Sequence, residues 1–551
     1  MDTAPDPYAG LPPAMIETAV AAADWIIILP VLLGMLGAAL MVMLRRSQPW
    51  QMPFSLLVVG AILVCDLQLF GRVLQTGPFT MTMGKWLPPF GISFTAEMLG
   101  VGFALAAAVV TLVVLAYAQV DTREAEQRKG FYPLVLLMLA GVHGAFLTGD
   151  FFNLYVWFEV ILISSFGLMV LSGREQVLDA AVKYGILNFV GTTLFLLALG
   201  FLNGILGTLN MADIAMRSPD APAGPMLAVA ALLLLAFGIK SAAFPVNAWL
   251  PASYHTPPAA ISALFAGLLT KVGVYALLKS LVLLLPGSLG ALQPLIAVIA
   301  IATLIVAPLG AIAETNLRRA LGFLVIGGIG AVLMGLALGN LRGIAGAAAY
   351  GAYAMFAMAA FYLVAGLVEK ITGTHDTRGM GGLYATNPIL AILFLALVFV
   401  AAGTPPLLGF WPKLILVEAA WEQSGIAQDG AVFDGLALAM LVALLLNALL
   451  TLIAGTRLWA HVFWRSGREG AMSELHNDRL RHLTSRERWL ALLPTGALVG
   501  FIALLGLMPN LFIDASRIAA SDLLAPERYI QSVGLAPDTR ATAQEEPGEV
   551  Q

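Results

Sequence analysis

Runs of 18 or more apolar residues recur from Trp25 to Phe512, and this feature decides what the chain can fold into. An α-helix needs about 20 consecutive apolar residues to cross a lipid bilayer, and soluble domains rarely contain such runs. Only 11% of the residues are charged, whereas soluble proteins carry about 25%. The sequence therefore predicts an all-α, polytopic membrane protein.

Windows of bilayer length between Gly, Pro and charged residues predict about fourteen membrane-spanning helices. If helices four to eight and nine to thirteen form two repeats, the chain has four parts. These parts are the first three helices (1–125), a first repeat (126–285), a second repeat (286–465), and a last helix with a disordered C-terminal tail (466–551). The predicted helix cores are 24–44, 53–75, 97–119, 131–149, 151–172, 180–206, 226–249, 258–284, 291–313, 319–339, 342–368, 386–421, 432–460 and 488–512.

The distribution of charge predicts the orientation and excludes several classes of function. Most of the 29 Lys and Arg residues lie in odd-numbered loops, including the cluster from Arg457 to Arg488. By the positive-inside rule these loops face the cytoplasm, so both termini are expected on the outer side. The net charge of -4 forms no basic stripe, so no nucleic-acid partner is expected. Because Cys65 is the single cysteine and carboxylates form no cage, we expect no metal and no cofactor.

Two predicted helices combine a proline inside the span with a lysine. The seventh contains Lys240 and Pro245, and the twelfth contains Pro405, Pro406 and Lys413. Proline removes a backbone hydrogen bond, so a helix broken there exposes carbonyls that water, ions or polar side chains must satisfy. Broken helices at matching positions of two repeats point to a transport site, although proline kinks without a function are also common.

Four ionisable residues lie well inside apolar runs: Glu159, Lys240, Lys271 and Lys413. Each charge would cost roughly 2.5 to 3.5 kcal/mol at a helix centre, so the four must be paired, hydrated or neutral. In general, burial disfavours the charged form of a group and a nearby opposite charge favours it, so a Glu–Lys pair that forms and breaks can load and release a proton. A static Glu159–Lys240 ion pair is the alternative, but it does not explain the two other lysines.

Several other polar residues have a weaker claim to function. Lys183 and Lys279 lie near predicted helix ends, where long side chains extend to the membrane interface. Asp150 is expected to be an interface residue, and His143 a hydrogen-bonded packing residue with an accessory role as the alternative. His255 lies in the loop between two lysine-bearing helices, and imidazole chemistry suits an accessory role in a proton path.

At these residues the chain resembles a known family: the antiporter-like subunits shared by respiratory complex I, membrane-bound hydrogenases and Mrp-type sodium/proton antiporters. The resemblance covers roughly residues 90 to 460. Its most specific parts are the run from Lys240 to Pro251 and the run from Pro257 to Leu277, which are most similar to the D subunits of Mrp antiporters. Secondary matches are Glu159, the stretch from Glu314 to Leu321, and the stretch from Gly403 to Lys413.

The resemblance implies fourteen helices with two inverted five-helix repeats, helices seven and twelve being broken. It also implies that Glu159 and Lys240 form a gating ion pair, that Lys271 is the central relay, and that Lys413 is the terminal site towards the outside. Two positions depart from the pattern of many relatives, which have a histidine where this chain has Asn247 and a lysine where it has Met358. A thioether carries no proton, so a relay past Met358 would need water or Lys413 directly.

These observations predict a proton-translocating subunit of a multisubunit Na⁺/H⁺ antiporter in the bacterial inner membrane. The chain itself is expected to be a secondary transporter subunit and not an enzyme, with other membrane subunits, H⁺, Na⁺ and lipid as partners. The alternative is the same kind of subunit in a redox-driven complex, such as a complex I-like NADH dehydrogenase or a membrane-bound hydrogenase. A purely structural subunit and a stand-alone solute transporter are less favoured, because buried lysines without a substrate pocket suit protons.

Overall fold

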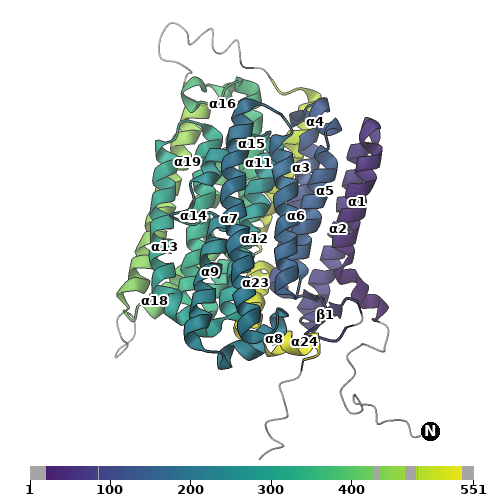
Figure 1. Cartoon of the computed structure of the whole chain (residues 1–551). Coiled ribbons are helices and arrows are strands. Elements are labelled where there is room, and N and C mark those ends of the chain that lie inside the picture. The colour runs from purple at the N-terminus through teal and green to yellow at the C-terminus, as the bar shows by residue number, and fades with distance from the viewer. Residues whose placement is uncertain (1–19, 85, 427–433, 466–479, 481, 536–551) are drawn as a thin grey trace, which may run out of the picture.

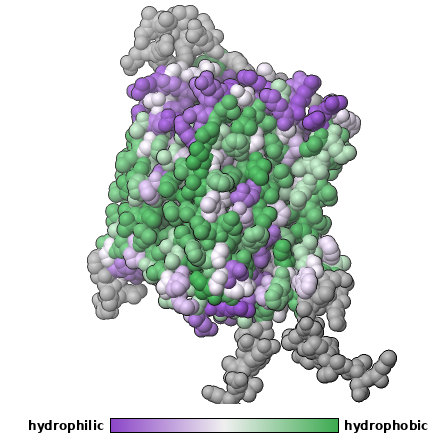
Figure 2. Space-filling view, in the orientation of Figure 1, coloured by the Kyte–Doolittle hydropathy of each residue, from purple (hydrophilic) through white to green (hydrophobic). Residues whose placement is uncertain are grey.

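The structure is a computed structural model that describes residues 20–535 apart from residues 85, 427–433, 466–479 and 481. Long helices run roughly side by side and form one bundle (Figure 1). Apolar residues cover the flank of the bundle, and hydrophilic residues gather at its two ends (Figure 2). A protein that spans a bilayer presents such a belt to the lipid tails.

The described residues form helices with few strands, in agreement with the predicted all-α class. The elements are α1 (Leu29–Met43), α2 (Gln48–Thr76), β1 (Phe79–Thr82), β2 (Ser93–Ala96), α3 (Met98–Asp121), α4 (Glu124–Arg128), α5 (Phe131–Leu147), α6 (Phe151–Val170), α7 (Glu175–Leu206), α8 (Met211–Arg217), α9 (Ala223–Ser241), α10 (Trp249–Ser253), α11 (Ala259–Leu264), α12 (Thr270–Leu278), α13 (Pro286–Ala313), α14 (Leu317–Leu338), α15 (Leu341–Thr372), α16 (Leu383–Thr386), α17 (Pro388–Ala402), α18 (Phe410–Gln423), α19 (Gly435–Trp459), α21 (Ser485–Glu487), α22 (Leu493–Leu507), α23 (Asn510–Leu524) and α24 (Glu527–Val533).

In the described part of the chain, 12 helices are long and apolar enough to cross a membrane. Two shorter apolar helices, α5 and α17, lie where the fourth and twelfth spans are predicted. Each of these helices overlaps one of the predicted cores. The chain is an integral, multi-pass membrane protein, as the composition predicts.

The helices differ strongly in how much protein surrounds them. The most apolar part of the span Ala259–Leu284, which contains α11 and α12, is 100% buried, and that of α15 is 94% buried. The corresponding part of α1, near one edge of the bundle, is only 33% buried. The span that carries Lys271 is therefore at the centre, where no lipid reaches it.

The two predicted helix breaks are present. Helix α9 ends at Ser241, Ala242 adopts the left-handed conformation with a φ of 62°, and the chain turns before α10. Helix α17 ends at Ala402, Gly403 adopts a φ of 85°, and α18 begins seven residues later at Phe410. The predicted prolines, Pro245, Pro405 and Pro406, lie in the two connecting segments. Because proline has no N–H group, these segments cannot continue the helical hydrogen bonding.

The two ends of the bundle are chemically different. One end, which carries α4 and α16, is the more hydrophilic in the view shown in Figure 2. We call it the arginine-rich face, because Arg123, Arg174, Arg318 and Arg378 lie in or beside its loops. The other end carries β1, α8 and α24, and we call it the opposite face (Figure 1).

The segment after Phe512 differs from the predicted disordered tail. Residues up to Val533 form α23 and α24, and α23 packs against α15 and α3. The hydroxyl groups of Ser532 and Thr80 lie 3.1 Å apart, which joins α24 to the β1–β2 hairpin. The prediction was wrong here because α23 is amphipathic and buries one face. The stretch from Asp538 to Gln551 lies outside the described residues.

Candidate functional site

Lys240 lies in the last turn of α9, directly before the first helix break. Its side chain is 5% exposed, and the Nζ atom is 4.7 Å from the centroid of the Phe158 ring on α6. The indole N–H of Trp249 donates to the Ile239 carbonyl at 3.0 Å, so α10 satisfies one acceptor at the end of α9. The break thus places an ammonium group against an aromatic face inside the protein.

Glu159 follows Phe158 on α6, so its carboxylate is on the helix that packs beside Lys240. The Glu159 side chain is partly exposed, and the ion pairs of the described residues do not include a Glu159–Lys240 contact within 4 Å. Beside Lys240 is a cavity of about 20 Å³ lined by residues that include Tyr184 and Asn188. A space of roughly 10–15 Å³ is enough for one water when polar groups line it. The structure therefore shows the two residues as neighbours whose charges are separated.

Lys271 lies at the start of α12, directly after a π-helical turn formed by Phe265–Leu269. The Nζ atom donates to the Ala266 carbonyl in that turn at 2.7 Å, and the side chain is only 1% exposed. A π-turn disturbs the regular helical ladder and is frequent at functional sites. Here it supplies the backbone acceptor of a buried lysine.

A glycine lets α12, the helix that holds Lys271, approach the end of α9 closely. A Cβ atom added at Gly273 on α12 would lie 2.9 Å from the Ser241 amide nitrogen and 3.3 Å from the Lys240 Cβ. Only glycine allows α12 to approach the end of α9 this closely. The sequence-based interpretation did not single out Gly273, because a glycine in an apolar run gives no sign of what it touches.

Lys413 lies on α18, directly after the second break, and it binds the helix before the break. Its Nζ atom donates to the carbonyls of Ala401 at 2.8 Å and Ala402 at 2.9 Å. These carbonyls end α17 and have no partner within the helix, and the negative end of a helix attracts a cation. The lysine therefore caps the half-helix, while the indole of Trp411 donates to the Gly506 carbonyl on α22 at 2.8 Å.

Among the described residues, the three lysines are alike in their burial and in the lack of a carboxylate in ion-pair contact. Each is at most 7% exposed, and the described residues place no carboxylate oxygen within 4 Å of any of their Nζ atoms. Lys271 and Lys413 donate hydrogen bonds to backbone carbonyls. A lysine without a counter-charge can exchange its proton at a lower cost than one held in an ion pair.

The predicted accessory residues have different surroundings. His143 is fully buried and hydrogen-bonded, as expected of a packing residue: its Nε2 atom is 2.9 Å from the carboxylate of Asp66 on α2. Lys183 is exposed and pairs with Asp179 on the same helix at 2.5 Å, so it lies at the surface. Neither residue touches the three buried lysines through a hydrogen bond or ion pair that the structure describes.

His255 lies in the loop after α10, at the arginine-rich face. Its Nδ1 atom is 2.9 Å from the Pro251 carbonyl. Burial lowers the pKa of His255 to about 4, and Arg318 and Arg319 add to this, while the Pro251 carbonyl and Glu369 oppose it. The imidazole is therefore neutral at pH 7 and fits a hydrogen-bonding role better than a proton store.

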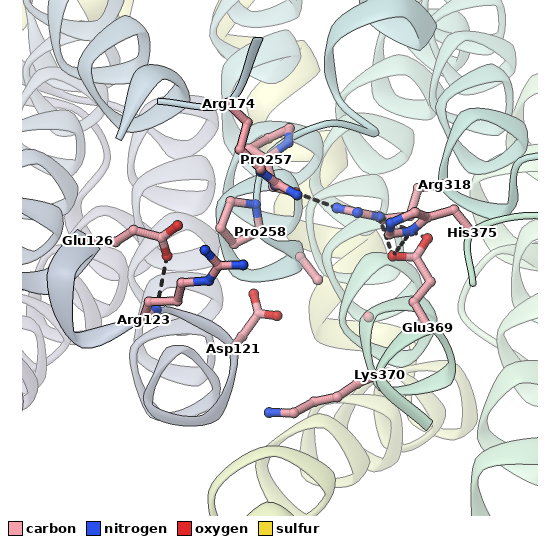
Figure 3. A pocket seen from close by; sticks show the side chains of 12 residues that line it. Asp121, Arg123, Glu126, Arg174, Pro257, Pro258, Arg318, Glu369, Lys370 and His375 are labelled. Atoms are coloured by element: carbon pink, nitrogen blue, oxygen red, sulfur yellow. Dashed lines mark hydrogen bonds and ion pairs between the residues drawn. The ribbon is translucent and has the colours of Figure 1, made fainter. Parts of the chain in front are cut away.

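Two cavities open at the arginine-rich face, above the ends of the central helices. One has a volume of about 240 Å³ and is lined by charged residues from four helices and loops (Figure 3). At its rim Arg318 pairs with Glu369 at 2.9 Å and also donates to the Pro257 carbonyl at 2.5 Å. The other cavity, of about 400 Å³, includes His255 and Lys183. Water can therefore reach the loop that precedes α11 from this side.

A buried ion pair near the opposite face was missed. Lys279, which was expected to extend to the interface, is 1% exposed and pairs with Glu97 at 2.5 Å. The expectation was wrong because α23 and α24 cover this end of the span. Asp150, also at this face, caps α6 by accepting from the Asn153 amide at 2.7 Å, and burial raises the pKa of Asp150 to about 6.

Comparisons with known proteins show the family to which the chain belongs. Residues 148–437 match the family described as NADH:quinone oxidoreductase/Mrp antiporter, transmembrane. The chain is 35% identical to the D subunit of the Na⁺/H⁺ antiporter of Alkalihalophilus pseudofirmus, over 92% of this chain and 99% of that protein. The chain belongs to the NADH:quinone oxidoreductase/Mrp antiporter family of membrane subunits. The family resemblance drawn from the lysine-bearing motifs is confirmed.

Further members of the family extend the comparison. The corresponding D subunit of the Na⁺/H⁺ antiporter of Bacillus subtilis is 34% identical, over 92% of this chain and 99% of that protein. A chain of the Mrp complex from Dietzia sp. DQ12-45-1b superposes with a TM-score of 0.83 and 28% identity, over 93% of this chain and 100% of that chain. A chain of respiratory complex I from Thermus thermophilus shares the fold, with a TM-score of 0.75 and 24% identity over 91% of this chain and 100% of that chain. The named relatives are antiporter subunits, which are secondary transporters and not enzymes, as expected from the sequence.

Proposed function

We propose that the chain is the proton-translocating subunit of a multisubunit Na⁺/H⁺ antiporter in the bacterial inner membrane. The observation that carries this proposal is the set of three buried lysines, Lys240, Lys271 and Lys413, none of which has a counter-charge in ion-pair contact within the described part of the chain. Three such charges without a function would cost on the order of 10 kcal/mol. Proton transfer is the chemistry that such amines support without a cofactor.

The orientation follows from the charge of the loops. The arginine-rich face is cytoplasmic by the positive-inside rule, and both termini are on the outer side. External protons then move inward in exchange for cytoplasmic Na⁺, driven by the membrane potential. The two cavities beside Arg318 give the cytoplasmic end of the path access to water.

The switch in this path is the Glu159–Lys240 pair. When Glu159 turns towards Lys240, the ammonium form of Lys240 is stabilised and its proton is held. When the two separate, as in this structure, Lys240 releases its proton towards the cytoplasmic side and can take up the next proton from Lys271. Lys413 is the terminal site beyond Lys271, and the two breaks occupy matching positions if helices four to eight and nine to thirteen are inverted repeats.

The partners are the other membrane subunits of the same antiporter, together with H⁺, Na⁺ and lipid. The similarity to a chain of the Mrp complex supports this assignment. The similarity to a chain of complex I concerns the fold. The second candidate function is therefore a proton-pumping subunit of a redox-driven complex. Its driving chemistry would lie on another subunit.

One experiment separates the two candidates. The native complex is purified in mild detergent, its subunits are identified by mass spectrometry, and everted membrane vesicles are tested for proton movement. Small hydrophobic partners and proton flux on addition of Na⁺ support the antiporter. A flavin or iron-sulfur protein in the particle, with proton flux on addition of a reductant only, would overturn it in favour of the redox-driven pump.

A further inference from the structure

A cluster of charged and hydroxyl groups fills the end of the central span at the opposite face. Glu97 directly precedes α3, and its Oε2 atom is 2.5 Å from the Nζ atom of Lys279. Both side chains are at most 3% exposed. This pair is as deeply buried as the three lysines of the proposed path, and its lysine lies on the same span as Lys271.

Tyr275 lies between Lys271 and this pair. The residues 271, 275 and 279 follow one another at intervals of four, so they lie along one side of the helix with a rise of about 6 Å per step. The hydroxyl oxygen of Tyr275 is 3.3 Å from Glu97 Oε1 and 3.1 Å from the Phe146 carbonyl oxygen. Its single hydrogen can therefore point to either acceptor.

The cluster continues towards the outside through the C-terminal helices. The Nζ atom of Lys279 lies 4.0 Å from the centroid of the Tyr529 ring on α24. Asp522 on α23 pairs with Arg528 at 3.3 Å, and the Arg528 side chain is 56% exposed. The second carboxylate oxygen of Asp522 is buried and has no hydrogen-bond partner within the described part of the chain. Asp522 thus pairs with a charged surface residue and is close enough to Glu97 and Lys279 to feel their charges.

Burial raises the pKa of Asp522 to about 6, and the negative charge of Glu97 adds to this effect. The cations Arg528 and Lys279 oppose it. A carboxyl group in this position can accept and release a proton near neutral pH. The geometry alone already places it at the boundary between the cluster and water.

A static ion pair that locks α3 to the central span would explain Glu97 and Lys279. It would not explain a tyrosine hydroxyl on the span of Lys271 that can turn between Glu97 and the Phe146 carbonyl, or a buried carboxylate oxygen that no donor of the described residues satisfies. Buried polar atoms in native proteins are nearly always satisfied, so the exception needs a reason.

Resting on the proposed function, we propose that this cluster is the outer proton mouth of the chain: external protons enter at Asp522, pass to the Glu97–Lys279 pair, and reach Lys271 through Tyr275. This route from Asp522 to Lys271 differs from the path that the family resemblance implies, in which Lys413 is the terminal site towards the outside. It runs down the same span that holds the central relay.

The proton balance of each step is simple. Asp522 takes up a proton from water and gives it to the Glu97 carboxylate, which is then neutral beside the Lys279 ammonium. The Tyr275 oxygen accepts that proton while its own hydrogen leaves for the neutral Lys271 amine, so the phenol is unchanged. In this structure Lys271 points to Ala266, so its flexible side chain must swing towards Tyr275 or use a bridging water.

The test measures Na⁺-driven proton flux in everted vesicles that contain the whole complex, with subunit yield as the assembly check. Tyr275→Phe keeps the ring, which packs 5.2 Å from the Phe146 ring, and removes only the hydroxyl. We expect at least a tenfold lower rate for Tyr275→Phe and for Glu97→Gln. The matched controls are Tyr132→Phe, which removes a buried hydroxyl bonded to Gln119, and Asp24→Asn, which breaks the Asp24–Arg72 pair near the same face.

Asp522→Asn supplies a second readout that a purely structural role would not move. We expect the dependence of the rate on the pH at the outer side, set by loading the vesicles between pH 5 and pH 8, to flatten around pH 6. The inference is overturned if Tyr275→Phe and Asp522→Asn stay within twofold of wild type at every pH while Lys271→Ala abolishes exchange. If Lys271→Ala also leaves exchange unchanged, the proposed function itself fails, which is a different result. If Glu97→Gln prevents assembly of the complex, Tyr275→Phe and Asp522→Asn alone test the inference.

Discussion

Replacing Lys413 by methionine should lower proton exchange at least tenfold while leaving the complex folded and assembled. The methionine side chain fills a similar volume, so packing around α18 is preserved. What disappears is one buried ammonium group and its two hydrogen bonds, to Ala401 at 2.8 Å and Ala402 at 2.9 Å.

The two effects on the free energy of unfolding have opposite signs. Each carbonyl left without a donor costs about 1–3 kcal/mol, so the two together cost about 2–6 kcal/mol. Removal of a charge from the membrane interior returns about 2.5–3.5 kcal/mol. The net change therefore lies between about 1.5 kcal/mol of stabilisation and about 3.5 kcal/mol of destabilisation.

The assay compares Na⁺-driven proton flux in everted vesicles with unfolding of the purified complex in an SDS titration. The control is Lys129→Met, because Lys129 is exposed, lines neither cavity, and donates to the Leu171 carbonyl at 3.3 Å. We expect less than a tenth of the wild-type rate for Lys413→Met and an unchanged rate for the control. Full activity would show that Lys413 is off the path, and a loss above about 5 kcal/mol would show that its role is structural.

Individual contacts support three further predictions. Gly506→Ala places a Cβ atom 2.4 Å from the Leu408 amide nitrogen, so it should distort the second break and lower flux at least fivefold, whereas Gly500→Ala meets nothing within 4 Å and should be silent. Glu369→Gln leaves the buried Arg318 charge without its partner and should destabilise the complex by about 3–5 kcal/mol in the SDS titration; a change below about 1 kcal/mol would contradict the buried pair. His255→Gln should leave flux unchanged from pH 7 to pH 9, since the histidine is neutral there. Because the folded pKa of His255, about 4, lies below the ordinary value of 6.5, the wild type loses stability as the pH falls from about 6.5 to about 4, and this loss should be smaller in the variant; an equal loss would refute the shift.

Much of the fold could be predicted because membrane spans are local features. A run of apolar residues must be helical in lipid, so the windows around the predicted cores coincide with helices in the structure. The breaks at Pro245 and Pro405 were also predictable, since proline acts on the residues next to it. The lysines beside these breaks could also be recognised, because a charged residue inside an apolar run is a local feature of the sequence.

The partners of the buried charges could not be predicted, because they come from distant parts of the chain. Glu97 precedes the third span and Lys279 ends the eighth, and no periodicity in either segment points to the other. The same holds for Asp66 and His143, which pair between α2 and α5. A lysine near a helix end extends to the interface only if no other part of the protein covers that end. Helix α23 covers the end that holds Lys279, and the apolar pattern in the sequence of α23 is too weak to predict this.

The central claim is that Lys271 carries the translocated proton. The most direct test replaces Lys271 by alanine in the complete complex and measures Na⁺-driven proton flux in everted vesicles at equal complex content. Exchange should fall to the background of vesicles that lack the complex, while subunit composition stays unchanged. Exchange at the wild-type rate in an assembled Lys271→Ala complex would contradict the relay.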